Sequence, residues 1–173
     1  MNTSDLVGLL QQCALERLTI FRHMEAREFG YPVATDFDAL LAYKRGDYLR
    51  CLRLSTHNFH REYASSVISV LAFPEFIQLL DNDIVSLTAL TLIVNPECRE
   101  GYSRYVCISH LTFSLYLMTQ CQLKLRHSVT SLAQTLDYIT DAHRTYLRTS
   151  DIKTLDRLVL EMTAHKALIY IKQ

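Results

Sequence analysis

Apolar residues recur at three- and four-residue steps along most of the chain, with polar residues between them. This spacing places the apolar side chains on one face of an α-helix, and it predicts an all-α protein. Only four glycines and three prolines interrupt the 173 residues, and none lies beyond Gly101. Because a β-sheet of this size needs many more turns, the sparse breakers also favour helices. The pattern predicts seven or eight helices, arranged as consecutive hairpins.

The clearest hairpin is centred on Gly46 and Asp47. One helix is predicted from Thr35 or Asp36 to Gly46, since glycine adopts the left-handed conformation that often ends a helix. Asp47 is a good N-cap for the helix that follows. Two helices joined by so short a turn lie antiparallel and share their apolar faces.

The middle of the chain combines clear and ambiguous patterns. Residues 63–73 fit either the end of a helix or a short strand, because β-branched residues favour the strand only weakly. Residues 84–94 are apolar almost all round, which predicts that this helix is the central, buried one. The other expected elements are a first helix from Leu6 to Gly30, a short helix after Pro74, a loop over 96–103, helices over 111–125 and from Val129, the latter capped by Ser128, and a last helix after Asp151.

Composition indicates one globular domain, residues 1–173, with 49% apolar and 21% charged residues. Eighteen cations balance eighteen anions, so nucleic-acid binding is not expected. The N-terminus lacks the features of a signal peptide, and the longest uncharged stretch, 105–123, is too polar for a membrane span. Five widely spaced cysteines favour reduced thiols and a cytoplasmic location.

No short motif indicates catalysis or phosphate binding, and four scattered glycines do not form a phosphate-binding loop. The densest set of potential metal ligands is Cys51, His57 and His60. On one helix the first and last of these lie more than two turns apart, too far to share a zinc ion. We therefore expect no catalytic residues, no cofactor and no metal, and hence a protein that is not an enzyme.

The segment from Ala42 to Tyr48, with the sequence AYKRGDY, resembles the turn of a tetratricopeptide repeat. Ala39 and Cys51 occupy its small-residue positions, whereas Thr35 replaces a large aromatic residue and the closing proline is missing. The match covers one repeat of about 34 residues, although at least three are normally needed for a solenoid. The resemblance implies a tetratricopeptide-like stack of antiparallel helix pairs.

Three other segments carry a wider resemblance: TDFDAL at 35–40, PEFIQLLD at 74–81 and LYLMTQCQL at 115–123. They resemble a helical region in lineage-expanded families of uncharacterised marine-invertebrate proteins. In some of these, the region follows a nucleotidyltransferase-like domain related to cyclic GMP–AMP synthase. Two functions are therefore considered: a non-catalytic protein-interaction or scaffold module, and an accessory helical domain of a nucleotide-sensing or nucleotidyltransferase-like innate-immunity protein.

The tetratricopeptide resemblance also implies where a protein or peptide partner would bind. The inner face of each pair comes mainly from its first helix, so Asp36, Tyr43 and Lys44 are predicted to contact the partner. Arg50 and Arg53, on the second helix, would add longer-range attraction. The alternative is that Tyr43 packs against the first helix and that Lys44 is only solvated.

Four cations surround the predicted turn: Lys44, Arg45, Arg50 and Arg53. They form either a solvated rim, partly neutralised by Asp47, or a docking patch for an acidic peptide.

Overall fold

The computed structural model describes residues 33–60, 67–69, 80–94, 107–148 and 154–173, and the isolated positions 9, 12, 13, 16, 19 and 20. These residues are predominantly helical, which confirms the expected all-α class. In chain order, the described ranges contain α2 (Val33–Lys44), α3 (Tyr48–His60), β1 (Val67–Ser69), α4 (Asn82–Val94), β2 (Cys107–Ser109), α5 (His110–Lys124), α6 (Val129–Arg148) and α7 (Thr154–Ile171).

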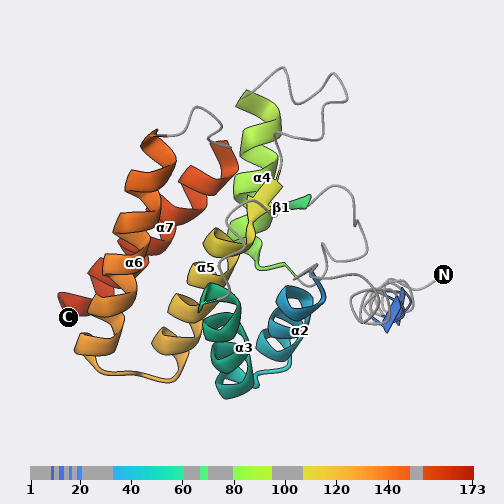
Figure 1. Cartoon of the computed structure of the whole chain (residues 1–173), viewed down its shortest axis with the longest axis horizontal. Coiled ribbons are helices and arrows are strands. Elements are labelled where there is room, and N and C mark those ends of the chain that lie inside the picture. The colour runs from blue at the N-terminus through green and yellow to red at the C-terminus, as the bar shows by residue number, and fades with distance from the viewer. Residues whose placement is uncertain are drawn as a thin grey trace.

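Helices α2 and α3 form the hairpin expected from the sequence and lie side by side (Figure 1). Gly46 has a φ of 79°, and the N–H of Asp47 donates to the carbonyl of Ala42 at 2.9 Å. The carboxylate of Asp47 accepts a hydrogen bond from the backbone N–H of Arg50 at 3.1 Å. The predicted left-handed turn and N-cap are therefore both confirmed.

The ambiguous region contains a strand. β1 pairs antiparallel with β2, with Val67 opposite Ser109 and Ser69 opposite Cys107. Of the two structures considered for residues 63–73, the short strand is therefore found at 67–69. Its partner strand, which leads directly into α5, was not predicted from the sequence.

The central helix is α5, and the prediction that residues 84–94 form the central helix is wrong. Every residue of α5 from Thr112 to Gln122 is buried, because α5 packs against α2, α3, α6 and α7. In α4 the buried residues are Ile84, Thr88 and Thr91. Apolar composition shows that α4 would tolerate burial, but the number of neighbouring helices decides which helix is central.

A tight turn connects α5 to α6, and α7 packs against both (Figure 1). The hydroxyl of Ser128 accepts a hydrogen bond from the N–H of Ser131 at 3.3 Å, which confirms the expected N-cap. Leu9 and Cys13, from the predicted first stripe, are helical and exposed. The rest of that stripe, the loop over 96–103 and nearly all of the short helix after Pro74 lie outside the described residues. In the part of the chain that is described, none of the helices has the length and apolar content needed to cross a membrane.

Candidate functional site

The structure buries two of the five residues that were predicted to contact a partner and exposes the other three. Asp36 and Tyr43 are buried, with 1% and 9% of their surface exposed, so the prediction that they line an open binding face is wrong. Their burial follows from the helical spacing, because both lie on the same face of α2 as the fully buried Leu40. Lys44, Arg50 and Arg53 are exposed, as a docking surface requires.

The exposed cations gather around the α2–α3 turn. Lys44 is the last residue of α2 and Arg45 follows it in the turn, whereas Arg50 and Arg53 lie in the first two turns of α3. We call these four residues the basic turn. Asp47, Leu49, Arg50 and Arg53 line a shallow depression of about 330 Å³ there. Leu49 is 68% exposed, so an apolar side chain lies beside the positive charges.

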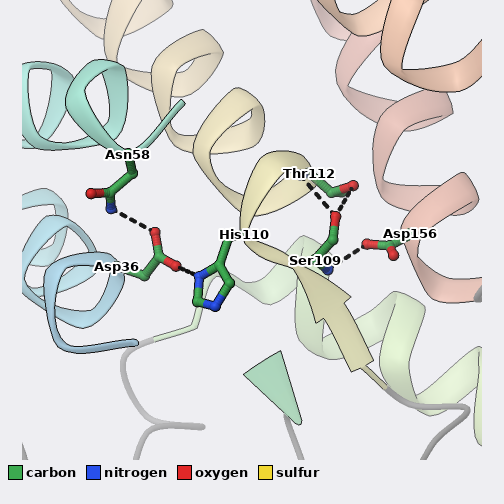
Figure 2. A network of polar contacts seen from close by, with 6 residues as sticks. All are labelled: Asp36, Asn58, Ser109, His110, Thr112 and Asp156. Atoms are coloured by element: carbon green, nitrogen blue, oxygen red, sulfur yellow. Dashed lines mark hydrogen bonds and ion pairs between the residues drawn. The ribbon is translucent and has the colours of Figure 1, made fainter. Parts of the chain in front are cut away.

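A cluster of buried polar side chains links α2 and α3 to the start of α5 (Figure 2). The carboxylate of Asp36 accepts a hydrogen bond from the amide of Asn58 at 2.7 Å, and its second oxygen pairs with Nδ1 of His110. All three side chains are buried. Burial raises the pKa of Asp36, against the opposing effect of its contacts with His110 and Asn58.

A second buried carboxylate holds the start of α5 from the other side. Asp156 of α7 accepts a hydrogen bond from the backbone N–H of Ser109 at 2.7 Å (Figure 2). The hydroxyl of Ser109 accepts from the N–H of Thr112 at 3.1 Å and so caps the helix. The N-terminal end of α5 is therefore tied to α2, α3 and α7 by polar contacts.

An aspartate paired with a histidine is also a common acid–base unit, in which the carboxylate orients the imidazole. Here Nε2 of His110 is buried and has no hydrogen-bond partner among the described residues. The residue is only 4% exposed, so in this conformation a substrate has no access to the imidazole. The arrangement therefore acts as a tie between helices. The sequence did not indicate this pair, because Asp36 and His110 are 74 residues apart in the chain.

A third polar cluster surrounds Asp81, the residue before α4. The hydroxyls of Tyr43 and Tyr116 donate to the same carboxylate oxygen at 3.3 and 2.9 Å. Partial burial opposes ionisation, but the hydrogen bond from Tyr116 and the charge of Lys44 together hold the pKa of Asp81 below its usual value. The same carboxylate also accepts a hydrogen bond from the backbone N–H of Asn82, at 3.0 Å.

Helices α6 and α7 enclose an open groove of about 480 Å³. His143 and Glu161 approach each other across it, with 3.5 Å between Nε2 and Oε1. No group of three or more potential metal ligands occurs among the residues that the structure describes. The groove is lined by Ile139, Thr140, His143, Arg144, Leu160, Glu161, Ala164, His165 and Leu168.

Comparison of the chain with protein-family models, with curated proteins and with solved structures finds no match.

Proposed function

We propose that this chain is a non-catalytic protein-interaction module built as a tetratricopeptide-like stack of helix pairs, and that it binds an acidic partner protein at the basic turn. The observation that carries the proposal is the exposure of four cations at the turn of a well-packed helical hairpin. Two of them, Arg50 and Arg53, line a depression together with the exposed Leu49 and with Asp47.

The order in which the helices pack supports the stacked-pair architecture. In stacked helical pairs, the two helices of a pair pack on each other and each pair contacts only its neighbours. Helix α2 packs on α3, and α5 packs on both helices of that hairpin as well as on α6 and α7. On this basis α2–α3 and α5–α6 are successive pairs, α7 begins a third, and α4 is an insertion between the first two.

The chemistry of the basic turn favours an acidic peptide. An exposed ion pair contributes only about 0–1 kcal/mol, so charge alone gives weak, salt-sensitive attraction. Burial of a leucine side chain contributes about 1.5–3 kcal/mol. A partner that covers the exposed Leu49 would gain part of this free energy on binding. A ligand with alternating acidic and apolar residues would use both contributions.

The test is a titration of a fluorescently labelled peptide of alternating glutamate and leucine, followed by fluorescence anisotropy at low and physiological salt. Arg50→Glu/Arg53→Glu should bind at least about tenfold more weakly than the unaltered protein, because four unit charges change at the surface. Glutamate is favourable near the N-terminus of a helix, so the variant should fold.

The matched control is Lys124→Glu/Lys172→Glu, which makes the same change in net charge at two other exposed positions. An equal loss of binding in the control would contradict a local site. Tighter binding of duplex DNA than of the acidic peptide would instead favour the nucleotide-sensing function.

A further inference from the structure

Two cysteines meet where α3 packs on α5, and the two helices lie side by side (Figure 1). Cys51 ends the first turn of α3, and Cys121 begins the last turn of α5. Both residues are fully buried and belong to the main hydrophobic core. The thiol of Cys121 donates a hydrogen bond to the sulfur of Cys51. The two sulfur atoms are therefore in contact, and no helix has to move to bring them together. We call Cys51 and Cys121 the thiol pair.

The two thiols of the pair are chemically unequal. The hydrogen bond from Cys121 lowers the pKa of Cys51, against the opposing effect of burial. The hydroxyl of Ser55, which lies 3.9 Å from the same sulfur, lowers this pKa as well. The hydrogen bond to Cys51 and burial both raise the pKa of Cys121. Cys51 therefore loses its proton first and is the better nucleophile, whereas Cys121 stays protonated beside it.

A cysteine in a protein core often serves only as a small apolar residue. The thiol pair differs in two respects, because sulfurs from two separate helices touch and because a hydroxyl lies beside the sulfur of Cys51. A thiol of lowered pKa in contact with a second thiol is the arrangement in which a sulfenic acid on the first sulfur condenses with the second to a disulfide. The geometry of the pair therefore suits an oxidation confined to its two members.

We propose that Cys51 and Cys121 are a modification site, at which hydrogen peroxide forms a disulfide that links α3 covalently to α5. Cys51 is the thiol that reacts with peroxide, and Cys121 is the thiol that completes the disulfide. The site includes none of the four cations of the basic turn, so the inference does not rest on the proposed function.

The reaction consumes one molecule of hydrogen peroxide and releases two of water. The Cys51 thiolate attacks one peroxide oxygen, so that an S–O bond forms and the O–O bond breaks. The hydroxide released takes up the proton that Cys51 lost, and Cys51 is then a sulfenic acid. The sulfur of Cys121 attacks that of Cys51, which forms the S–S bond and breaks the S–O bond, and the departing hydroxide takes up the proton of Cys121. Both sulfurs are oxidised, and both peroxide oxygens are reduced.

Burial controls the rates at which the disulfide forms and is reduced. Neither sulfur is exposed, so peroxide reaches the pair through local openings of the fold and oxidises it more slowly than the exposed Cys13. A thiol such as glutathione must likewise reach the buried disulfide before it can reduce it. The bond joins positions about 70 residues apart, which restricts the unfolded chain and so stabilises the folded one.

The test treats the folded chain with hydrogen peroxide and locates the disulfide by mass spectrometry. Cys13→Ser is the parent protein, because this exposed thiol would otherwise link two copies of the chain. The remaining thiols are blocked with N-ethylmaleimide in urea. Chymotrypsin, which cleaves after tyrosine, leucine and methionine, then separates Cys107 from Cys121. We expect the chain to lose two hydrogen atoms and to yield a peptide pair that joins Cys51 to Cys121.

Single substitutions in the same parent test the roles of the two thiols. Cys121→Ser removes the second thiol and keeps a hydroxyl donor, so Cys51 should stop at the sulfenic acid and be trapped by dimedone. Cys51→Ser should give at least about tenfold less dimedone adduct at Cys121, whose thiolate is disfavoured. Circular dichroism establishes that each variant is folded. Equal adducts at the two positions, or Cys51 joined to Cys98 or Cys107 in the parent, would overturn the proposal.

Comparison of the oxidised and reduced parent needs no substitution in the core, so it stays decisive if the serine variants do not fold. The oxidised chain should unfold at a urea concentration at least about 0.5 M higher, and dithiothreitol should restore the original midpoint. Glutathione should reduce the disulfide at least about tenfold more slowly in native buffer than in urea that unfolds the chain. If the folded parent forms no disulfide, or if the oxidised chain unfolds at the same or a lower urea concentration, the proposal is overturned.

Discussion

Single residues determine how the first hairpin turns. Gly46 has a φ of 79°, and a Cβ added there would meet no atom within 4 Å. The requirement for glycine is therefore one of backbone conformation, since the surrounding space is open. This makes Gly46 a position at which conformational strain can be measured without a steric clash.

Gly46→Val should lower the free energy of unfolding by about 1–2 kcal/mol, because a β-branched residue is strained at positive φ. Urea unfolding followed by circular dichroism measures the change. Gly46→Asn is the control, since asparagine tolerates this conformation and should cost less. An unchanged midpoint in the valine variant would show that the turn does not need a left-handed residue.

Asp36 is another single residue that stabilises the fold, and its contacts join segments that are far apart in the sequence. Asp36→Ala should destabilise the protein by about 2–4 kcal/mol, because the buried groups of Asn58 and His110 lose their acceptor. The exposed Asp137, replaced by alanine, should change stability by less than about 0.5 kcal/mol. Equal effects of the two substitutions in urea unfolding would rule out a stabilising role for the buried cluster.

At the scale of elements, α5 is central although it contains many polar residues. Thr112, Ser114, Thr119, Gln120 and Gln122 are all buried in it. Some of these groups are satisfied locally: the hydroxyl of Thr119 donates to the carbonyl of Leu115 at 2.9 Å. Local hydrogen bonding lowers the cost of burying such residues, so polarity along the chain does not identify the exposed helix.

The same substitution in two helices tests which of them is central. Leu117→Ala, at a fully buried position of α5, should cost about 2–5 kcal/mol through lost burial and an interior cavity. Leu90→Ala, at a position of α4 that is 47% exposed, should cost about 1 kcal/mol or less. Denaturant unfolding compares the two, and a larger loss for Leu90→Ala would mean that α4 carries more of the core than this packing allows.

At the scale of the whole molecule, α3 and α5 hold two buried thiols close together. Cys51 and Cys121 are fully buried. The contact with Cys51 and burial both raise the pKa of Cys121, which disfavours its reactive thiolate. Cys13, in contrast, is exposed. The reactivity of these three thiols therefore reports how firmly the assembled helices stay closed.

In the native protein, iodoacetamide should alkylate Cys13 rapidly and Cys51 and Cys121 only when the fold opens. Mass spectrometry of tryptic peptides, sampled over time at increasing urea, measures each rate. The two buried cysteines should become reactive together at the unfolding transition, because both lie in one cooperative unit. Native labelling of Cys51 at the rate of Cys13 would contradict the packing of α3 on α5.

The sequence by itself determined the helical class and several helix ends. Gly46, Asp47 and Ser128 were identified correctly because a turn or cap depends on the backbone of only a few neighbouring residues. Only the tertiary structure decided which distant segments of the chain contact each other. It buried Asp36 beside His110, 74 residues away, and Tyr43 against Asp81, and it made α5 rather than α4 the central helix. Such contacts depend on how distant segments pack in space, and neither periodicity nor composition records which segments become neighbours.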